Sequence, residues 1–170
     1  MAVITIGQTF HDAAASYAGK TLLTVRPGSE ADGTGIITSV WVRAYNAVAG
    51  FKIGTFTLVS DTDYVLNASA IIGDLSAGDN NISGLSIAVT AGDLIGAYWD
   101  SGQLRHDSQA HVDGSILRYE GDAFVGGQIT YIAGTAYCIA ATGTGTTEIP
   151  SPTVFSGNGS IKVARNFQRM

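Results

Sequence analysis

Two histidines and two aspartates crowd into one polar segment in the second half of the chain. The segment RHDSQAHVDG places His106, Asp107, His111 and Asp113 within eight residues. Imidazole nitrogens and carboxylate oxygens are the ligands that zinc and other transition metals take from proteins. The spacing matches no established metal site, and an EF-hand loop would need oxygen ligands at alternate positions and a glutamate at the twelfth. We therefore expect a long polar loop or a short exposed hairpin over residues 100–113, with a metal site as the alternative.

Two carboxylates separated by one glycine form a second candidate site. Glu120 and Asp122 have the side chains of a glycosidase acid/base pair. Residues two apart on a strand lie only about 6 to 7 Å apart, and the intervening Gly121 is typical of a turn. We therefore expect turn carboxylates. Motifs for a serine nucleophile, a P-loop or a dinucleotide site are absent, so the sequence predicts neither an enzyme nor a cofactor.

A third group of residues has the chemistry to bind a sugar ring. Tyr98 and Trp99 adjoin Asp100, and Trp41 and Tyr45 share one side of an earlier predicted strand. Aromatic rings beside polar groups form stacking platforms for ligands. Packing in the core is the interpretation that we favour for both tryptophans. The candidate glycan contacts are Tyr98, Trp99, Asp100, His106 and His111.

The strands that must position these residues are clearest in the segment ISGLSIAVTAGDLIGAYW, residues 82–99. Leu85, Ile87 and Val89 alternate with smaller or polar residues, and a second alternating run, 95–99, follows the break at 91–93. A period of two indicates strands with one face in a core. Residues 36–45 and 51–59 alternate in the same way across a short loop, so we expect these two strands to pair.

The remaining chain predicts further short strands and few helical residues. We expect strands over residues 1–6, 21–25, 64–72, 115–119, 123–131 and 135–141, a short helix over 11–18, and a polar connection over 73–81. Turn signals recur about every 8 to 12 residues, which is typical of a sandwich or barrel. The sequence therefore predicts an all-β antiparallel sandwich of the jelly-roll type with about nine or ten strands.

The composition points to one domain with an unusually uncharged surface. Of the 170 residues, 45% are hydrophobic and only 14% are charged, while 22 are glycine. Ordinary soluble domains carry about 25% charged residues. Such a surface is common on extracellular β-proteins and on subunits that pack against copies of themselves. Cys138 is the only cysteine, so no disulfide forms within the chain, and we expect its thiol to be buried.

The charge and hydropathy of the chain argue against nucleic acid and membrane partners. The formal net charge is −5, and the body of the chain carries no basic stripe. No apolar run approaches the ~18 residues of a membrane span, and MAVITIGQTF lacks the basic region and apolar core of a signal peptide. We therefore expect a chain that is made in a cytoplasm and does not insert into a membrane.

The last residues differ from the body in composition and charge. All 14 acidic residues precede residue 149, whereas residues 149–170 carry three basic residues and no acidic one. A Gly/Thr segment over 142–147, two prolines and a further flexible stretch of glycine and serine precede the segment IKVARNFQRM, and this composition is typical of an approach to an arm. We expect a β-sandwich domain over 1–148 and an extended basic arm over 149–170 that folds back on its own domain or adds to a neighbouring subunit as a strand. A frayed tail is the alternative. The expected arm contacts are Ile161, Lys162, Val163, Arg165, Phe167 and Arg169.

Four segments of the body together resemble the jelly-roll modules of phage and prophage virion proteins, including head-decoration and tail-associated subunits. They are GIITSVWVRAY, FKIGTF, the hairpin GLSIAVTAGDLIGAYW and YCIAATGTG, covering about residues 35–145. The resemblance implies a virion structural role, assembly in a host cytoplasm followed by release, and partners that are copies of the chain and other virion proteins. It transfers no functional residue. A glycan-binding or receptor-binding module is the alternative function.

Overall fold

The structure is a computed structural model that describes residues 2–8, 12–15, 18–24, 28–60, 63–107, 116–125, 128–129 and 139–146. These residues form twelve strands and one turn of 3-10 helix. The elements are β1 (Ala2–Gln8), β2 (Asp12–Ala15), β3 (Thr21–Thr24), β4 (Thr34–Ala44), β5 (Val48–Ser60), β6 (Asp63–Leu75), β7 (Gly78–Val89), β8 (Leu94–Tyr98), β9 (Leu104–Asp107), β10 (Ile116–Tyr119), η1 (Ala123–Val125), β11 (Gln128–Ile129) and β12 (Ile139–Thr146).

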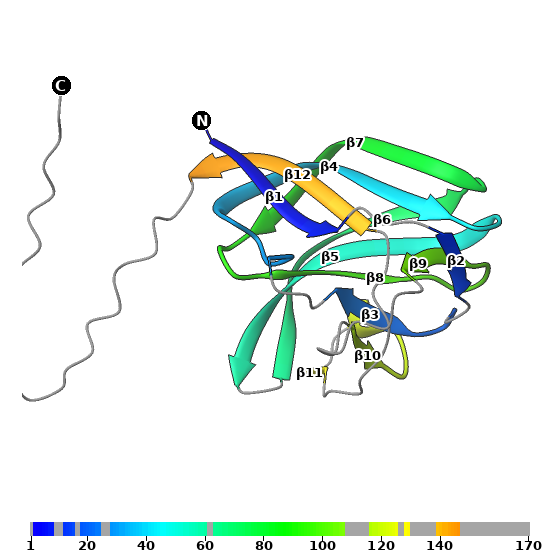
Figure 1. Ribbon diagram of the computed structural model, residues 1–170. Coiled ribbons are helices and arrows are strands. Elements are labelled where there is room, and N and C mark those ends of the chain that lie inside the picture. Colours follow the sequence, from blue (N-terminus) through cyan, green and yellow to red (C-terminus); the bar gives the residue numbers. More distant parts are fainter. Residues whose placement is uncertain are drawn as a thin grey trace, which may run out of the picture.

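The strands form two antiparallel sheets that pack face to face (Figure 1). Sheet A contains β1-β12-β4-β7, and β9 and β2 continue it from one end of β4 through the pair Ala44 and Leu104. Sheet B has the order β10-β3-β8-β5-β6-β11. Two four-stranded sheets ordered β1-β12-β4-β7 and β3-β8-β5-β6 are the strand order of a jelly roll. The predicted all-β sandwich is confirmed, with extra short strands at its ends.

The main core lies between the inner faces of the two sheets. Val40 and Val42 of β4 face Phe51 and Ile53 of β5, and none of the four is more than 2% exposed. Trp99, at the end of β8, is completely buried in this core. Alternation places every second residue inside, so these strands form because their apolar residues recur with a period of two.

The predicted pairing of residues 36–45 with 51–59 is wrong. Both segments are strands, but β4 belongs to sheet A and β5 to sheet B. The turn at residues 91–93 likewise connects β7 of sheet A to β8 of sheet B, so it is not a hairpin. In both cases the two strands lie in different sheets but each has one face in the common core, so their alternation is the same as that of paired neighbours.

Asp93 fixes the turn at residues 91–93, where the chain passes from sheet A to sheet B. Its carboxylate is 1% exposed and accepts hydrogen bonds from the Thr57 hydroxyl (2.7 Å), the Asn67 amide (2.8 Å) and the Thr90 backbone N–H (2.9 Å). These donors come from β5, β6 and the turn itself. A buried carboxylate needs such donors because its desolvation is otherwise costly.

Four other local predictions are corrected. Residues 12–15 form β2 rather than a helix, because their backbone pairs with β9. The segment 104–107 is the strand β9, which pairs with β2 and β4, whereas a loop or a short exposed hairpin is predicted over 100–113. Residues 73–81 are mostly strand, since β6 and β7 are joined only by Ser76 and Ala77. Of the predicted strand 123–131, the described residues form η1 and the two-residue strand β11, Gln128–Ile129.

A second, smaller core lies on the outer face of sheet B. Leu23, Phe56 and Leu94 point outward from this sheet and are covered by Ala123 of η1 and its neighbour Phe124. The rings of Phe56 and Phe124 meet edge to face, with centroids 5.6 Å apart. Sheet B is thus covered on both faces.

Within the described residues, no helix has the length and hydropathy needed to cross a bilayer.

Candidate functional site

The outer face of sheet A carries a shallow hollow centred on one tryptophan. Trp41 points away from the core because its neighbours Val40 and Val42 point into it, and its side chain is only half-buried. Three adjacent strands form the floor, with β4 between β12 and β7. In register, Trp41 lies beside Ala140 on one side and Asn81 on the other.

The next row of the same face is made of hydroxyl side chains. Ser39 lies beside Thr142 and Ser83, and the Ser39 and Thr142 hydroxyls are hydrogen-bonded at 2.8 Å. The hollow has a volume of about 310 Å³. Its lining consists of Ser39, Val40, Trp41, Asn81, Ile82, Ser83, Ala140 and Thr142. None of these side chains carries a charge, so the site offers an aromatic ring, hydroxyls and an amide.

The expectation that both tryptophans pack in the core holds for one of them. Trp99 is completely buried and donates from its indole nitrogen to the backbone oxygen of Gly102 (3.2 Å). A ring-stacking contact of Trp99 with a glycan is therefore excluded. Trp41 is the tryptophan that reaches the surface. The signal was in the sequence, because its side of the strand also carries Ser39 and Arg43, which are polar.

Tyr98 and Asp100 belong to a separate polar cluster on sheet B. Tyr98 lies opposite Lys52, whose ammonium nitrogen is 5.2 Å from the centre of the tyrosine ring. Burial and a hydrogen bond with Asp100 raise the pKa of Tyr98. This cluster shares no residue with the hollow on sheet A, so the structure separates Tyr98 and Asp100 from the exposed tryptophan.

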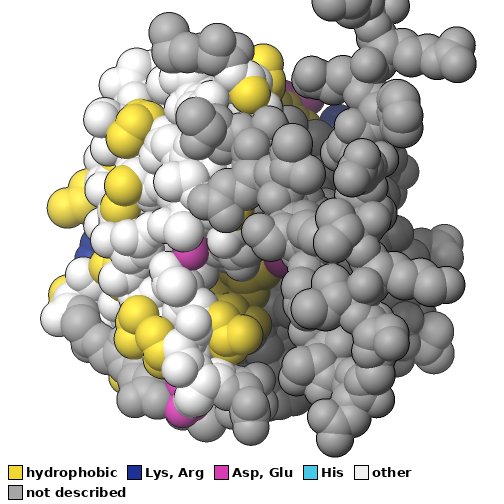
Figure 2. All heavy atoms as spheres, turned by 90° about the vertical axis from the view of Figure 1, so that its left-hand side faces the viewer, with side chains coloured by type: hydrophobic (Ala, Val, Ile, Leu, Met, Phe, Trp, Pro, Cys, Tyr) yellow, Lys and Arg dark blue, Asp and Glu magenta, His cyan; other side chains and the backbone are white. Residues whose placement is uncertain are grey.

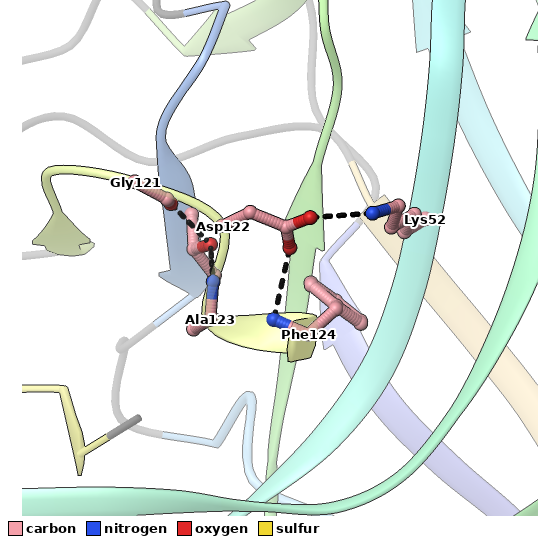
Figure 3. A network of polar contacts seen from close by, with 6 residues as sticks. Lys52, Gly121, Asp122, Ala123 and Phe124 are labelled. Atoms are coloured by element: carbon pink, nitrogen blue, oxygen red, sulfur yellow. Dashed lines mark hydrogen bonds and ion pairs between the residues drawn. The ribbon is translucent and has the colours of Figure 1, made fainter. Parts of the chain in front are cut away.

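The same lysine is joined to the turn that covers sheet B. Figure 3 shows Lys52 and Asp122 pointing toward each other, and they form an ion pair. The other oxygen of Asp122 accepts a hydrogen bond from the backbone N–H of Phe124 at 2.9 Å. The hydrogen bond with Asp122 raises the pKa of Lys52, although partial burial opposes this effect. Asp122 thereby holds η1 on the sheet.

The carboxylates Glu120 and Asp122 lie in the turn between β10 and η1, as predicted. Glu120 forms an exposed ion pair with Lys20 at 2.8 Å, and Asp122 is paired with Lys52. The Thr21 hydroxyl fixes the turn between them, since it donates to the oxygen of Gly121 and accepts from the N–H of Ala123, both at 2.8 Å. Both carboxylates therefore have clear structural partners.

Only part of the histidine segment is described. The backbones of His106 and Asp107 lie in β9, while His111 and Asp113 are outside the described residues. In the part of the chain that the structure describes, no three His, Cys, Asp or Glu side chains lie together as a metal site would require. Cys138 and all six predicted arm contacts from Ile161 to Arg169 also lie outside that part.

Two residues of the hollow come from segments that the sequence predicts to be irregular. Asn81 falls at the end of the predicted polar connection, and Thr142 begins the Gly/Thr segment assigned to the approach to the arm. Both are in strands that flank β4. No known protein family, no curated protein and no solved structure matches this chain.

Proposed function

We propose that this chain is a non-enzymatic structural subunit of a virion or a comparable filament, and that it joins its neighbours by strand addition at one side of the sandwich. The observation that carries the proposal is the pair of long strands β6 and β7 at that side. In the described residues, β7 pairs only with β4, and beyond β5 the strand β6 has only the two residues of β11 as a partner.

The middle of each of these edge strands carries no charge, although Asp63, Asp74 and Asp79 lie near the strand ends. Natural edge strands are commonly protected by lysine, proline or inward-pointing charge. Residues 64–73 of β6 and 80–89 of β7 contain no charged residue and no proline. Ile71 of β6 is 81% exposed, although it is a large apolar side chain. An edge strand without charge or proline in its middle, and with an exposed isoleucine, is suited to strand addition.

The regular part of the β7 edge is its first half. Residues 78–83 pair with β4 residue by residue, from Ala44 opposite Gly78 to Ser39 opposite Ser83. The register then shifts, and Gly84 has a φ of 76°, which marks a bulge. Because a bulge twists an edge away from a partner, we expect the added strand to lie along residues 78–83.

The opposite edge of sheet A is already occupied. The Thr5 N–H donates to a carboxylate oxygen of Asp32 (2.7 Å), and the Asp32 N–H donates back to the Thr5 oxygen (3.2 Å). The Gly7 N–H donates to the Ser29 oxygen at 2.7 Å. The loop around residues 28–32 therefore covers β1, and strand addition is directed to the β6 and β7 side.

The low charge of the chain favours burial against another subunit, because only 14% of its residues are charged. Figure 2 shows small groups of hydrophobic side chains separated by uncharged surface, with few charged groups. Such a surface has little charge to desolvate when another subunit covers it. The predicted basic arm, residues 149–170, is a second proposed contact and lies outside the described residues.

The test is the mass of the full chain by sedimentation, with negative-stain images, compared with two substitutions. We expect Ile71→Lys to shift the chain toward the monomer, because it places a charge beside the open edges. Val3→Lys is the matched control, since Val3 is 65% exposed on the covered strand β1. A monomeric wild-type chain, or equal effects of the two substitutions, would contradict the proposal. Removal of residues 149–170 tests the arm separately.

A further inference from the structure

The hollow on the outer face of sheet A is a site that the structural role does not use. Strand addition at β7 uses the backbone edge of residues 78–83, whereas the hollow lies on the outer face of β12, β4 and β7 and uses the outward side chains of Asn81 and Ser83. Trp41 is half-buried on the outer face of sheet A and points away from the core, so it has no role there. A subunit that only packed by strand addition would gain nothing from it.

We propose that this hollow binds a neutral pyranose ring stacked on the indole of Trp41. The C–H face of a pyranose is apolar and its edge carries hydroxyls, so it needs one aromatic surface surrounded by hydrogen-bonding groups. The hollow provides this arrangement. Trp41 lies beside the exposed amide of Asn81, and the hydroxyls of Ser39, Ser83 and Thr142 form the adjacent row.

The hydrogen-bonding capacity of the polar row is only partly used. Each hydroxyl has one donor hydrogen and two acceptor lone pairs. The bond between Ser39 and Thr142 uses one donor and one acceptor of that pair. One O–H and three lone pairs remain, which can exchange hydrogen bonds with sugar hydroxyls in either direction. The Asn81 amide adds a donor and an acceptor on the other side of the ring.

Electrostatics selects a neutral ligand. The eight lining residues include no charged side chain. The nearest charges along β4 and β7 belong to Arg43 and Asp79, which neutralise each other in an ion pair at 3.0 Å. A phosphate, a sialic acid or a cationic ligand would lose hydration without gaining an opposite charge, so these classes are disfavoured.

The size of the hollow limits the ligand to one or two rings. Ligand pockets usually span about 300 to 1,000 Å³, and this one is at the lower limit. A shallow site for so small a ligand gives a dissociation constant on the order of 1 mM. Affinity for a glycan-bearing surface would then depend on several copies binding together, which is the one point at which this inference rests on the proposed assembly.

The two tryptophans of the chain allow a direct test by fluorescence. The probes are the methyl glycosides of glucose, galactose, mannose and N-acetylglucosamine, added to the full-length chain. Trp41 is half-exposed and Trp99 is completely buried, so acrylamide quenching should report mainly on Trp41. We expect at least one glycoside to shift the emission to the blue and to protect the exposed fraction from acrylamide.

Three variants separate binding from folding. Trp41→Phe removes the reporter and shows that the remaining signal of Trp99 does not respond. Asn81→Ala keeps the reporter, and we expect it to weaken binding by about tenfold or less through loss of the amide. Tyr45→Ala is the matched control, because Tyr45 is an exposed aromatic residue just beyond the same strand and outside the lining. It should bind as the wild type does.

Two results would overturn the proposal. One is no spectral change with any of the four glycosides, or an equal loss of binding in Tyr45→Ala and Asn81→Ala. The other is protection of Trp41 that depends on protein concentration and not on added glycoside, which would show that a second copy covers the hollow. The glycoside response does not depend on whether the assembly of the proposed function forms, because the probes are monovalent.

Discussion

The outer faces of the two sheets are built from strands with the same alternation, but one is covered and the other is open. On sheet B, the outward residues Leu23, Phe56 and Leu94 are buried under η1. On sheet A, the outward residues around Trp41 are serine, threonine and asparagine, and they surround a hollow. The difference arises from the segment between β10 and η1, which folds over sheet B and is fixed there by Asp122.

The covered face also requires the absence of side chains at two positions. A Cβ at Gly54 would lie 2.6 Å from the Ala68 oxygen and 3.0 Å from the ring of Phe124. A Cβ at Gly96 would lie 2.6 Å from the ring of Phe56. Such distances are shorter than van der Waals contact, so these glycines make room for the phenylalanine pair. We therefore expect the segment over sheet B, residues 120–125, to be needed for stability. Substitutions on the outer face of sheet A should leave the chain folded.

The largest effect that would test this comparison is expected from Phe56→Ala. It should lower the free energy of unfolding by about 3 to 5 kcal/mol, because it removes the central ring of the second core. Trp41→Ala, on the open face, should lower it by less than about 1 kcal/mol. Urea unfolding of both variants measures the two values. Similar losses would show that the two faces are equally important for stability.

A smaller effect is expected from adding one methyl group to the covered face. Gly96→Ala should destabilise the chain by about 1 to 3 kcal/mol, because the ring of Phe56 must move. Ala88→Val is the control, since Ala88 is exposed on the outer face of β7. We expect it to change stability by less than about 0.5 kcal/mol. If Gly96→Ala is equally neutral, the packing of the cover is looser than the structure shows.

The smallest of the three effects concerns the ion pair that holds the cover. Asp122→Asn should lower the free energy of unfolding by about 1 to 2 kcal/mol, because it leaves Lys52 partly buried without its partner. Glu120→Gln is the matched control in the same turn. Glu120 is 51% exposed, and exposed pairs contribute about 0 to 1 kcal/mol. An equal loss in both variants would argue against a specific role for Asp122.

The same ion pair predicts a pH dependence. The pKa of Lys52 is raised by Asp122, so the stabilisation is fully present below the ordinary value of 10.5 and is lost as the pH rises through the raised value. The pKa of Tyr98 is raised mainly by burial and by Asp100, so ionisation of Tyr98 lowers the stability of wild type and variant alike in the same alkaline range. The difference in stability between wild type and Asp122→Asn should therefore shrink above about pH 10.5, as urea unfolding at several pH values would measure.

The sequence predicts the strands better than it predicts their neighbours. Alternation located β4, β7 and β8 because each has one face in the main core. It did not show that β4 and β5 lie in different sheets, since a strand facing its neighbour across a core has the same pattern as a strand paired with it. The short strand β2 was mistaken for a helix because its pairing with β9, distant in sequence, outweighs local propensity.

The Gly/Thr segment was mistaken for a flexible approach to the arm for a different reason. Glycine in β12 reflects close packing and not freedom. A Cβ at Gly143 would lie 2.0 Å from the oxygen of Ile36, and one at Gly145 would lie 2.1 Å from the oxygen of Thr34. The candidate site depends on this strand and on β7, so the sequence indicated Trp41 as an aromatic candidate but gave no means of placing Asn81 and Thr142 beside it.

The hydrogen bonds that cover β1 limit the symmetry of any assembly through sheet A. With β1 covered by residues 28–32 and β7 open, two copies that pair β7 with β7 join their A sheets through the same strand of each. An interface that uses the same surface on both partners is isologous, and it closes after two copies. The edge alone therefore gives a two-fold pair, and a growing particle or filament requires a second contact with different geometry.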